Sequence, residues 1–218
     1  MIDGGCYQQY CIAPALSLNV IPDNMPHDVA SMHFVNPLTA LGLHDKVKSL
    51  KASACIQTGA ASQLGRMLIK ICKQNKTPLI NIVRRDEQIT LLKEQYGAEI
   101  VLNSNAPNFK EDFTKLCKEM KATALIECVA GETTGQLMEC LPSRSTVIFY
   151  GALSEKGPCD IDPLILIGRS YEIEGFVLGQ YIAKKGLGII GVIRQCNALM
   201  ADKTVQSNIQ KKFGLKDF

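Results

Sequence analysis

The sequence has little that would direct the chain to a membrane, a nucleic acid or a secretory route. No apolar stretch approaches the roughly 20 residues that a membrane-spanning helix needs. The formal net charge is only +3, without a run of like charges, which argues against nucleic acid or a membrane surface as the partner. The start, MIDGGCYQQYCIAP, lacks the basic residues and apolar run of a secretory signal. We therefore expect an intracellular protein, in the cytoplasm or a mitochondrion.

The sequence also lacks the closely spaced cysteines and histidines of a metal site. None of its 9 cysteines forms a C-x-x-C pair. Most of them lie inside apolar runs, where cysteine behaves as a small buried hydrophobe, so we expect free thiols in a reducing compartment. The histidines, His27, His33 and His44, have no partners at the spacing of metal ligands. We predict that no metal is bound.

From Ala52 onward, short β-branched runs alternate with helical patterns. Most of the runs are continuously apolar, as expected for strands that are covered on both faces. Leu64, Met67, Leu68, Ile71 and Cys72 have helical spacing, and further helices are expected at 86–97, 109–120 and 137–141. The expected strands are 53–58, 78–83, 99–103, 124–129, 146–151 and 171–176. This alternation predicts an α/β fold, a Rossmann-type doubly wound parallel sheet of about six strands.

The two ends of the chain do not follow this alternation. Residues 1–35 contain short β-like runs and prolines without a helix between them, so we expect a β-rich segment there. Residues 181–218 are predicted to form a helical tail with a glycine-rich interruption at 186–191. The alternating part, 36–180, is the expected dinucleotide-binding domain.

The stretch CIQTGAASQLGR joins the first expected strand to the first helix. Such a loop directs backbone N–H groups and a helix dipole at a bound anion, and it suits a pyrophosphate. Against the three-glycine fingerprint of dinucleotide loops, Ala60 and Ser62 stand for the first two glycines, and Gly65 keeps the helix-packing position. An ordinary strand-to-helix turn rich in small residues is the alternative.

The second strand ends in NIVRRDE, with Arg84 and Arg85 where NAD-binding sheets carry an acidic residue. Guanidinium groups bind phosphate oxygens in a forked geometry, so the pair favours NADP(H) over NAD(H). A solvated charge pair is the alternative, and Asp86 is also a candidate N-cap of the next helix.

Several ordered motifs carry a resemblance to a known family: NPLTALG (36–42), QTGAASQLGRMLIKI (57–71), residues 78–104, STVIFYGAL (145–153) and EGFVLGQYI (174–182). The chain resembles the medium-chain dehydrogenase/reductase superfamily. Within that superfamily, it looks most like the zinc-independent NADPH:quinone reductases and mitochondrial-type 2-enoyl thioester reductases. Zinc-bearing relatives place a ligand where this sequence has Val35.

The resemblance implies an NADPH-dependent oxidoreductase that transfers hydride to an activated C=C bond or a quinone. It assigns cofactor-binding roles to Asn36, Thr39, Ala61, Ser62, Gln63, Leu64, Arg84, Arg85, Val129, Gly131, Gly151, Ala152, Leu153, Phe176 and Leu178. Other interpretations stay open for some of these: Gly151 can simply end a strand, Thr39 can cap a turn, and Phe176 can be a core residue.

Members of the superfamily have a longer front part, a GroES-like catalytic domain, of which residues 1–35 resemble the end. We expect the substrate-polarising groups in that part, so no catalytic residue is assigned. We expect that this chain alone binds NADPH without turnover. We also expect apolar surface around Phe34, Leu38 and Phe176, which another copy or a larger complex covers. The alternative function is a catalytically inactive NADPH-binding subunit with a structural or redox-sensing role.

Overall fold

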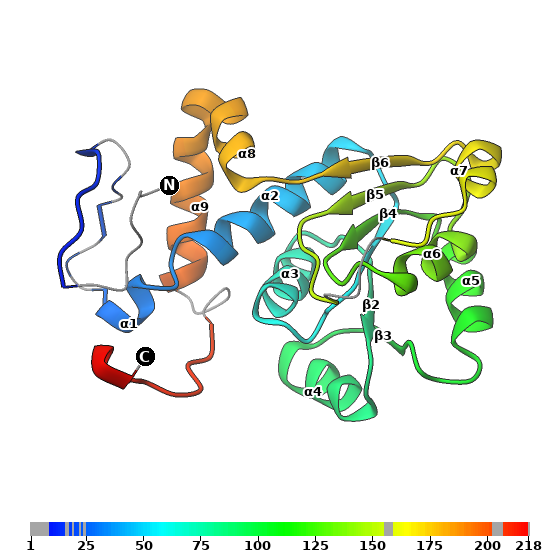
Figure 1. Ribbon diagram of the computed structural model, residues 1–218, viewed down its shortest axis with the longest axis horizontal. Coiled ribbons are helices and arrows are strands. Elements are labelled where there is room, and N and C mark those ends of the chain that lie inside the picture. Colours follow the sequence, from blue (N-terminus) through cyan, green and yellow to red (C-terminus); the bar gives the residue numbers. More distant parts are fainter. Residues whose placement is uncertain are drawn as a thin grey trace.

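A six-stranded parallel sheet forms the centre of the molecule (Figure 1). The computed structural model describes residues 9–15, 18, 20, 21, 23, 25–154, 159–201 and 207–217. The strands are β1 (Ala54–Gln57), β2 (Leu79–Val83), β3 (Ile100–Asn103), β4 (Ala122–Glu127), β5 (Thr146–Phe149) and β6 (Glu172–Gly175). Their order is β3-β2-β1-β4-β5-β6, and every neighbouring pair is parallel. The predicted α/β fold is confirmed.

The strand order reverses between β1 and β4. The chain first builds outward from β1 to β3 and then returns to add β4 on the other side of β1. In doubly wound sheets, ligands bind at this switch point, outside the carboxyl ends of the strands. All residues of β1 and β2 are buried. Most of them are apolar, and the polar pair is internally bonded, since Gln57 Nε2 donates to Asn81 Oδ1 at 2.7 Å.

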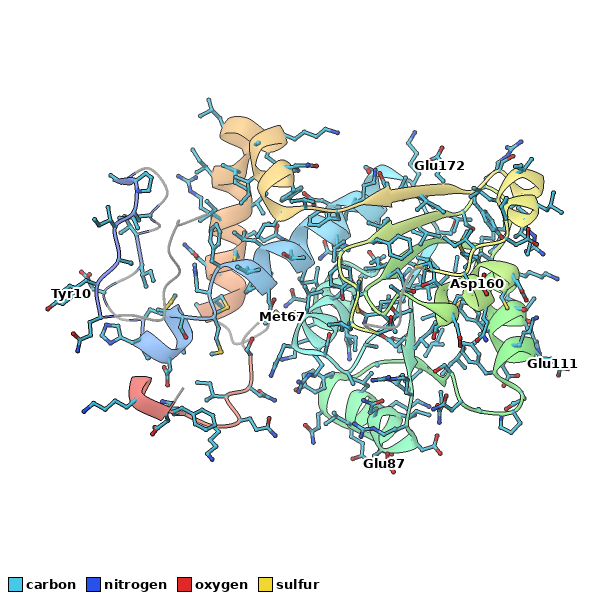
Figure 2. The ribbon with its side chains drawn as sticks, in the orientation of Figure 1. Tyr10, Met67, Glu87, Glu111, Asp160 and Glu172 are labelled. Carbon is cyan, nitrogen blue, oxygen red and sulfur yellow. The ribbon has the colours of Figure 1, made fainter. Side chains whose placement is uncertain are left out.

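Helices cover both faces of the sheet (Figure 1). One core cluster joins α2 (Val35–Ser49), α3 (Gln63–Gln74) and α4 (Asp86–Tyr96) to the sheet, and α9 (Ile189–Ala201) adds Cys196, Leu199 and Met200. The second cluster packs α5 (Phe109–Glu119), α6 (Glu132–Cys140) and α7 (Pro163–Arg169) on the opposite face. Figure 2 shows Glu87, Glu111 and Glu172 at the outside of this layered body.

The helices that flank β2 follow the sequence pattern, with one exception. In α3, the apolar side chains from Leu64 to Cys72 are buried, and α4 ends as expected at Gly97 in the left-handed conformation, φ 64°. Asp86, however, does not cap α4. The N-cap residue is Arg85, and the Asp86 carboxylate accepts a hydrogen bond from Asn103 Nδ2 at 2.7 Å. Because Asn103, at the end of β3, binds the Asp86 carboxylate, this carboxylate does not cap α4.

The C-terminal end of the chain matches the prediction, and the described part of the N-terminal end does not. The described residues between 9 and 26 contain no strand, so the β-rich segment expected in 1–35 is not found there, and the first regular element is α1 (His27–Ala30). A short extended run gains ladder hydrogen bonds only beside a partner strand. The helical tail is confirmed as α8 (Leu178–Lys185), the 3₁₀ turn η2 (Gly186–Gly188) and α9, with η3 (Leu215–Asp217) near the end.

The cysteines behave as small apolar residues. Cys6 lies outside the described residues; the others are free thiols, and those on the sheet and its covering helices are buried. Among the described residues, no three His, Cys, Asp or Glu side chains gather where they could hold a metal ion together. Within the same residues, no helix is both long and apolar enough to cross a membrane.

Candidate functional site

The loop between β1 and α3 turns tightly at Gly59. This residue has φ 58°, and its carbonyl accepts the N–H of Ser62 at 2.9 Å. A Cβ at Gly59 would lie 2.7 Å from Cys128 Sγ. The glycine of this turn is therefore Gly59. The sequence comparison with the three-glycine fingerprint had instead placed Ala60 at the position of the first glycine. The signal for Gly59 in the sequence was a lone glycine directly after the strand.

Helix α3 begins in close contact with this loop. Ser62 is its N-cap, and Ser62 Oγ accepts the Gly65 N–H at 3.0 Å. A Cβ at Gly65 would lie 2.6 Å from the carbonyl oxygen of Ala60, so only glycine lets the helix approach the loop this closely. The first-turn N–H groups of α3 lack intrahelical acceptors and carry the positive end of the helix dipole. This arrangement favours an anion.

The carboxyl ends of β2 and β3 form a second side of the site. The Arg84 N–H donates to Gln88 Oε1 at 3.1 Å, and the Arg84 carbonyl accepts from Asn105 Nδ2 at 2.9 Å. Ser104 is tied to the end of β2 by its N–H, which donates to the Val83 carbonyl at 2.8 Å. These bonds fix the backbone from which the Arg84 side chain projects.

The loops after β4 and β5 form a third side. The Leu153 N–H donates to the Cys128 carbonyl at 2.9 Å, and the Ser154 N–H donates to the Val129 carbonyl at 2.8 Å. Burial raises the pKa of the Cys128 thiol and of the Tyr150 phenol, so both groups stay protonated at neutral pH. Neither group is therefore a base at neutral pH.

The three sides enclose a cavity of about 260 Å³. Of the predicted residues, Ala61, Ser62, Arg84, Val129 and Leu153 line it together. Sequence reasoning missed several further residues of its lining, which are Thr58, Gly59, Ile82, Val83, Gln88, Ser104 and Thr133. Of the two predicted arginines, only Arg84 lines the cavity. Arg85 is the N-cap residue of α4 and is not among the lining residues.

The remaining predicted residues lie off this cavity. Asn36 and Thr39 are on α2, Leu64 is in the core, and Gly131 is the N-cap residue of α6. The Gln63 side chain bonds to the backbone of Asn208, at 3.0 Å to its carbonyl and 3.1 Å to its N–H. Gly151 and Ala152 are exposed beside Leu153. Phe176 and Leu178 pack against the α2 side of the core.

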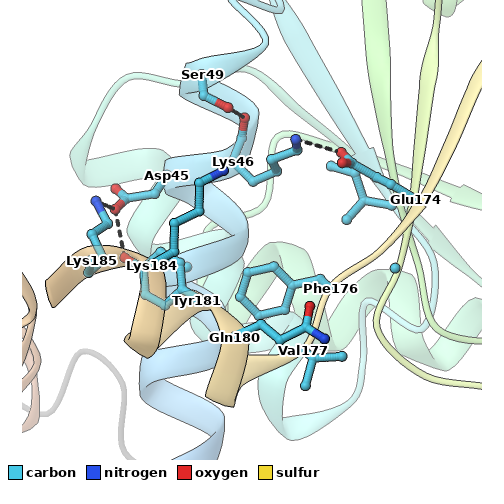
Figure 3. Close-up of a pocket in the computed structure, with 13 residues that line it drawn as sticks. Asp45, Lys46, Ser49, Glu174, Phe176, Val177, Gln180, Tyr181, Lys184 and Lys185 are labelled. Atoms are coloured by element: carbon cyan, nitrogen blue, oxygen red, sulfur yellow. Dashed lines mark hydrogen bonds and ion pairs between the residues drawn. The ribbon is translucent and has the colours of Figure 1, made fainter.

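Phe176 also lines a second cavity, of about 390 Å³, between α2, β6 and α8 (Figure 3). Two ion pairs cross it: Lys46 Nζ lies 2.8 Å from Glu174 Oε1, and Lys185 Nζ lies 2.8 Å from Asp45 Oδ2. The Tyr181 hydroxyl donates to the same Asp45 oxygen at 2.7 Å. Burial of Tyr181 and its bond to Asp45 raise the pKa of the phenol. The contacts of Asp45 fasten α8 to α2, and the Lys46–Glu174 pair connects α2 to β6.

The comparison with known families agrees with the fold. The family model described as "Zinc-binding dehydrogenase" matches residues 64–191, more than half of the chain, so the chain belongs to this family. The resemblance to the medium-chain dehydrogenase/reductase superfamily is confirmed.

The chain is similar to curated enoyl reductases from several organisms. The mitochondrial enoyl-[acyl-carrier-protein] reductase of Arabidopsis thaliana is 24% identical over 200 residues, which are 90% of this chain and 52% of that protein. The enzyme of the same name from Dictyostelium discoideum is 29% identical, over 74% of this chain and 47% of that protein. The chain spans about half the length of the curated relatives it matches.

The chain also superposes on solved structures of reductases. A Mesorhizobium loti protein provisionally described as an NADPH:quinone reductase superposes with a TM-score of 0.77 at 31% identity, covering 84% of this chain and 53% of the other. A mutant enoyl thioester reductase from Candida tropicalis has a TM-score of 0.74 at 21% identity, covering 90% and 58%. The second likeness establishes the fold alone.

Proposed function

We propose that the chain binds NADPH and belongs to an oxidoreductase that transfers hydride to an activated C=C bond or a quinone. The observation that carries the proposal is the cavity at the switch point, with a close-approach loop on one side and Arg84 on another. The names of the relatives support it: they include enoyl reductases and a protein provisionally described as an NADPH:quinone reductase. One structural neighbour is a complex with NADP and crotonyl-CoA.

The lining fits a dinucleotide with a 2′-phosphate. Backbone N–H groups at Ala61, Gln63 and Leu64, with Ser62, would bind the pyrophosphate. Arg84 would bind the 2′-phosphate by forked hydrogen bonds, and Arg85 would contribute only a more distant charge. Val129 and Leu153 would form the opposite wall, with Gly131 beside it.

The nicotinamide end of the site is also part of the proposal. We assign it to Asn36, Thr39, Gly151, Ala152, Phe176 and Leu178, which lie outside the cavity just described. When bound, the cofactor supplies the hydride, and the chain's own residues bind and orient it. We assign no catalytic residue within this chain.

Location and assembly extend the proposal. The mitochondrial names of several relatives support a mitochondrial setting. The apolar surface expected around Phe34, Leu38 and Phe176 is not exposed, because Leu38 is buried and the two rings pack against the core. Other exposed apolar side chains near β6 support an assembly in which another copy or another subunit covers them; they are Leu164, Ile167, Ile173 and Val177.

Titration of the purified chain with NADPH and with NADH tests the cofactor assignment. We expect saturable binding of one NADPH per chain, at least about tenfold tighter than NADH, which corresponds to about 1.4 kcal/mol. The physical reason is the 2′-phosphate, which only NADPH offers to Arg84. Equal affinities would contradict the NADP(H) preference, and no binding up to millimolar NADPH would contradict the function itself.

A further inference from the structure

Glu127 is a buried carboxylate beside the cavity, although it does not line it. It is the last residue of β4, its exposed fraction is 0%, and it lies at the switch point of the sheet. Burying a carboxylate is costly unless hydrogen bonds or a cation compensate it. In the described part of the chain, no ion pair reaches Glu127.

One oxygen of this carboxylate joins two walls of the cavity. Glu127 Oε1 accepts hydrogen bonds from the Thr58 hydroxyl at 2.8 Å, the Val129 N–H at 2.6 Å and the Ala130 N–H at 3.0 Å. The Thr58 hydroxyl in turn accepts the Cys128 N–H at 3.0 Å. Thr58 begins the loop after β1, and Val129 belongs to the loop after β4. Beside the backbone bond from the Thr58 N–H to the Ile126 carbonyl at 3.0 Å, the Glu127 oxygen is thus the side-chain acceptor that links these two loops.

The loop after β4 depends on these bonds for its shape. Ala130 has φ 63°, a left-handed conformation that is unfavourable for a residue with a Cβ. The two N–H bonds to Glu127 hold this turn, and the Leu153 and Ser154 N–H groups are anchored on it through the Cys128 and Val129 carbonyls. Both Val129 and Leu153, which line the cavity, are therefore placed by Glu127.

The other carboxylate oxygen points to a role beyond stability. Glu127 Oε2 is buried and has no hydrogen-bond partner among the described residues. An apolar residue at the end of the strand would avoid this cost, whereas only an acceptor can hold Thr58 and the loop N–H groups together.

We propose that Glu127 is a positioning residue of the cofactor site: it fixes the distance between the β1 and β4 loops and so preforms the cavity. It acts through Thr58, Val129 and Leu153 and does not touch the cofactor. This inference rests on the proposed function, because the nucleotide is what the preformed cavity receives.

The test compares Glu127→Leu, Glu127→Gln and Thr58→Val with the control Glu139→Gln. Glu139 is an exposed residue of α6 that pairs with Lys110. Calorimetry gives the dissociation constant for NADPH at a temperature where circular dichroism shows every variant folded.

We expect NADPH binding to be about tenfold weaker, or more, in Glu127→Leu and in Thr58→Val. The double variant Glu127→Leu/Thr58→Val should bind NADPH no more weakly than Glu127→Leu, because both substitutions remove the same hydrogen bond between Thr58 and Glu127. The glutamine, which keeps an acceptor oxygen, should recover most of the affinity.

Amide hydrogen exchange tests the positioning role of Glu127 without NADPH and without the Glu127→Leu variant. In ligand-free Thr58→Val, we expect faster exchange at Val129, Ala130 and Leu153 and unchanged exchange in α5. Unchanged exchange and unchanged affinity in folded Thr58→Val would overturn the positioning role, as would loss of thermal stability alone. If the wild-type chain fails to bind NADPH, the proposed function fails, and the cofactor role of Glu127 fails with it.

Discussion

Replacement of Gly65 by alanine is expected to lower the free energy of unfolding by about 1–3 kcal/mol, the usual range for an overpacked site, and to abolish NADPH binding. The added Cβ would lie 2.6 Å from the Ala60 carbonyl oxygen and 2.8 Å from the Ala60 carbonyl carbon and Cα. These are backbone atoms, so relief requires moving the loop or the start of α3. Either movement displaces the N–H groups proposed to bind the pyrophosphate.

Gly168→Ala is the matched control. Gly168 lies in α7, and a Cβ there meets nothing within 4 Å. Because alanine has the higher helix propensity, this variant should be as stable as the wild type or up to about 1 kcal/mol more stable. Urea denaturation gives both free energies. A Gly65→Ala chain with wild-type stability and NADPH affinity would show that the close approach of α3 to the loop is unimportant.

Arg84→Ala is expected to weaken NADPH binding by about 10–100-fold while leaving NADH binding nearly unchanged. A hydrogen bond to a charged group contributes about 1.5–3 kcal/mol, and each 1.4 kcal/mol is about a factor of ten in affinity. Arg84 lines the cavity, and a bound 2′-phosphate is the group that its guanidinium would contact. The measurement is calorimetric titration with each cofactor.

The neighbouring arginine is the control for charge alone. Arg85→Ala removes the same formal charge from a residue outside the cavity lining, so its effect should stay within about threefold. Increasing the salt concentration should shrink this small effect further, because exposed charges are screened. A larger loss in Arg85→Ala than in Arg84→Ala would reverse the assignment of the two residues.

The parts of the fold that depend on local pattern could be predicted from the sequence. The buried runs around Ile56, Ile80 and Leu125 became neighbouring strands, and the apolar spacing from Leu64 to Cys72 became the buried face of α3. Strand ends were less accurate, since β4 ends at Glu127, where its carboxylate bonds the next N–H groups and turns the chain.

The features that sequence reasoning missed depend on partners distant in the chain. Asp86 was expected to cap α4, but Asn103 holds its carboxylate. Gly59 is needed because Cys128 Sγ lies against it, and the Gln63 amide is engaged by Asn208. Glu127 lay within the expected strand 124–129 and was assigned no role. None of these contacts follows from spacing along the sequence, because each needs the tertiary placement of both residues.

The most direct test of the central claim, that NADPH binds in the cavity at the switch point, is amide hydrogen exchange of the whole chain with and without saturating NADPH. We predict slower exchange with cofactor in segments 58–66, 82–88 and 127–134, which surround the cavity. Segment 109–119 in α5, on the opposite face of the sheet, should not change. Protection confined to the second cavity, in segment 178–185, or no protection in any of the three cavity segments, would contradict the account.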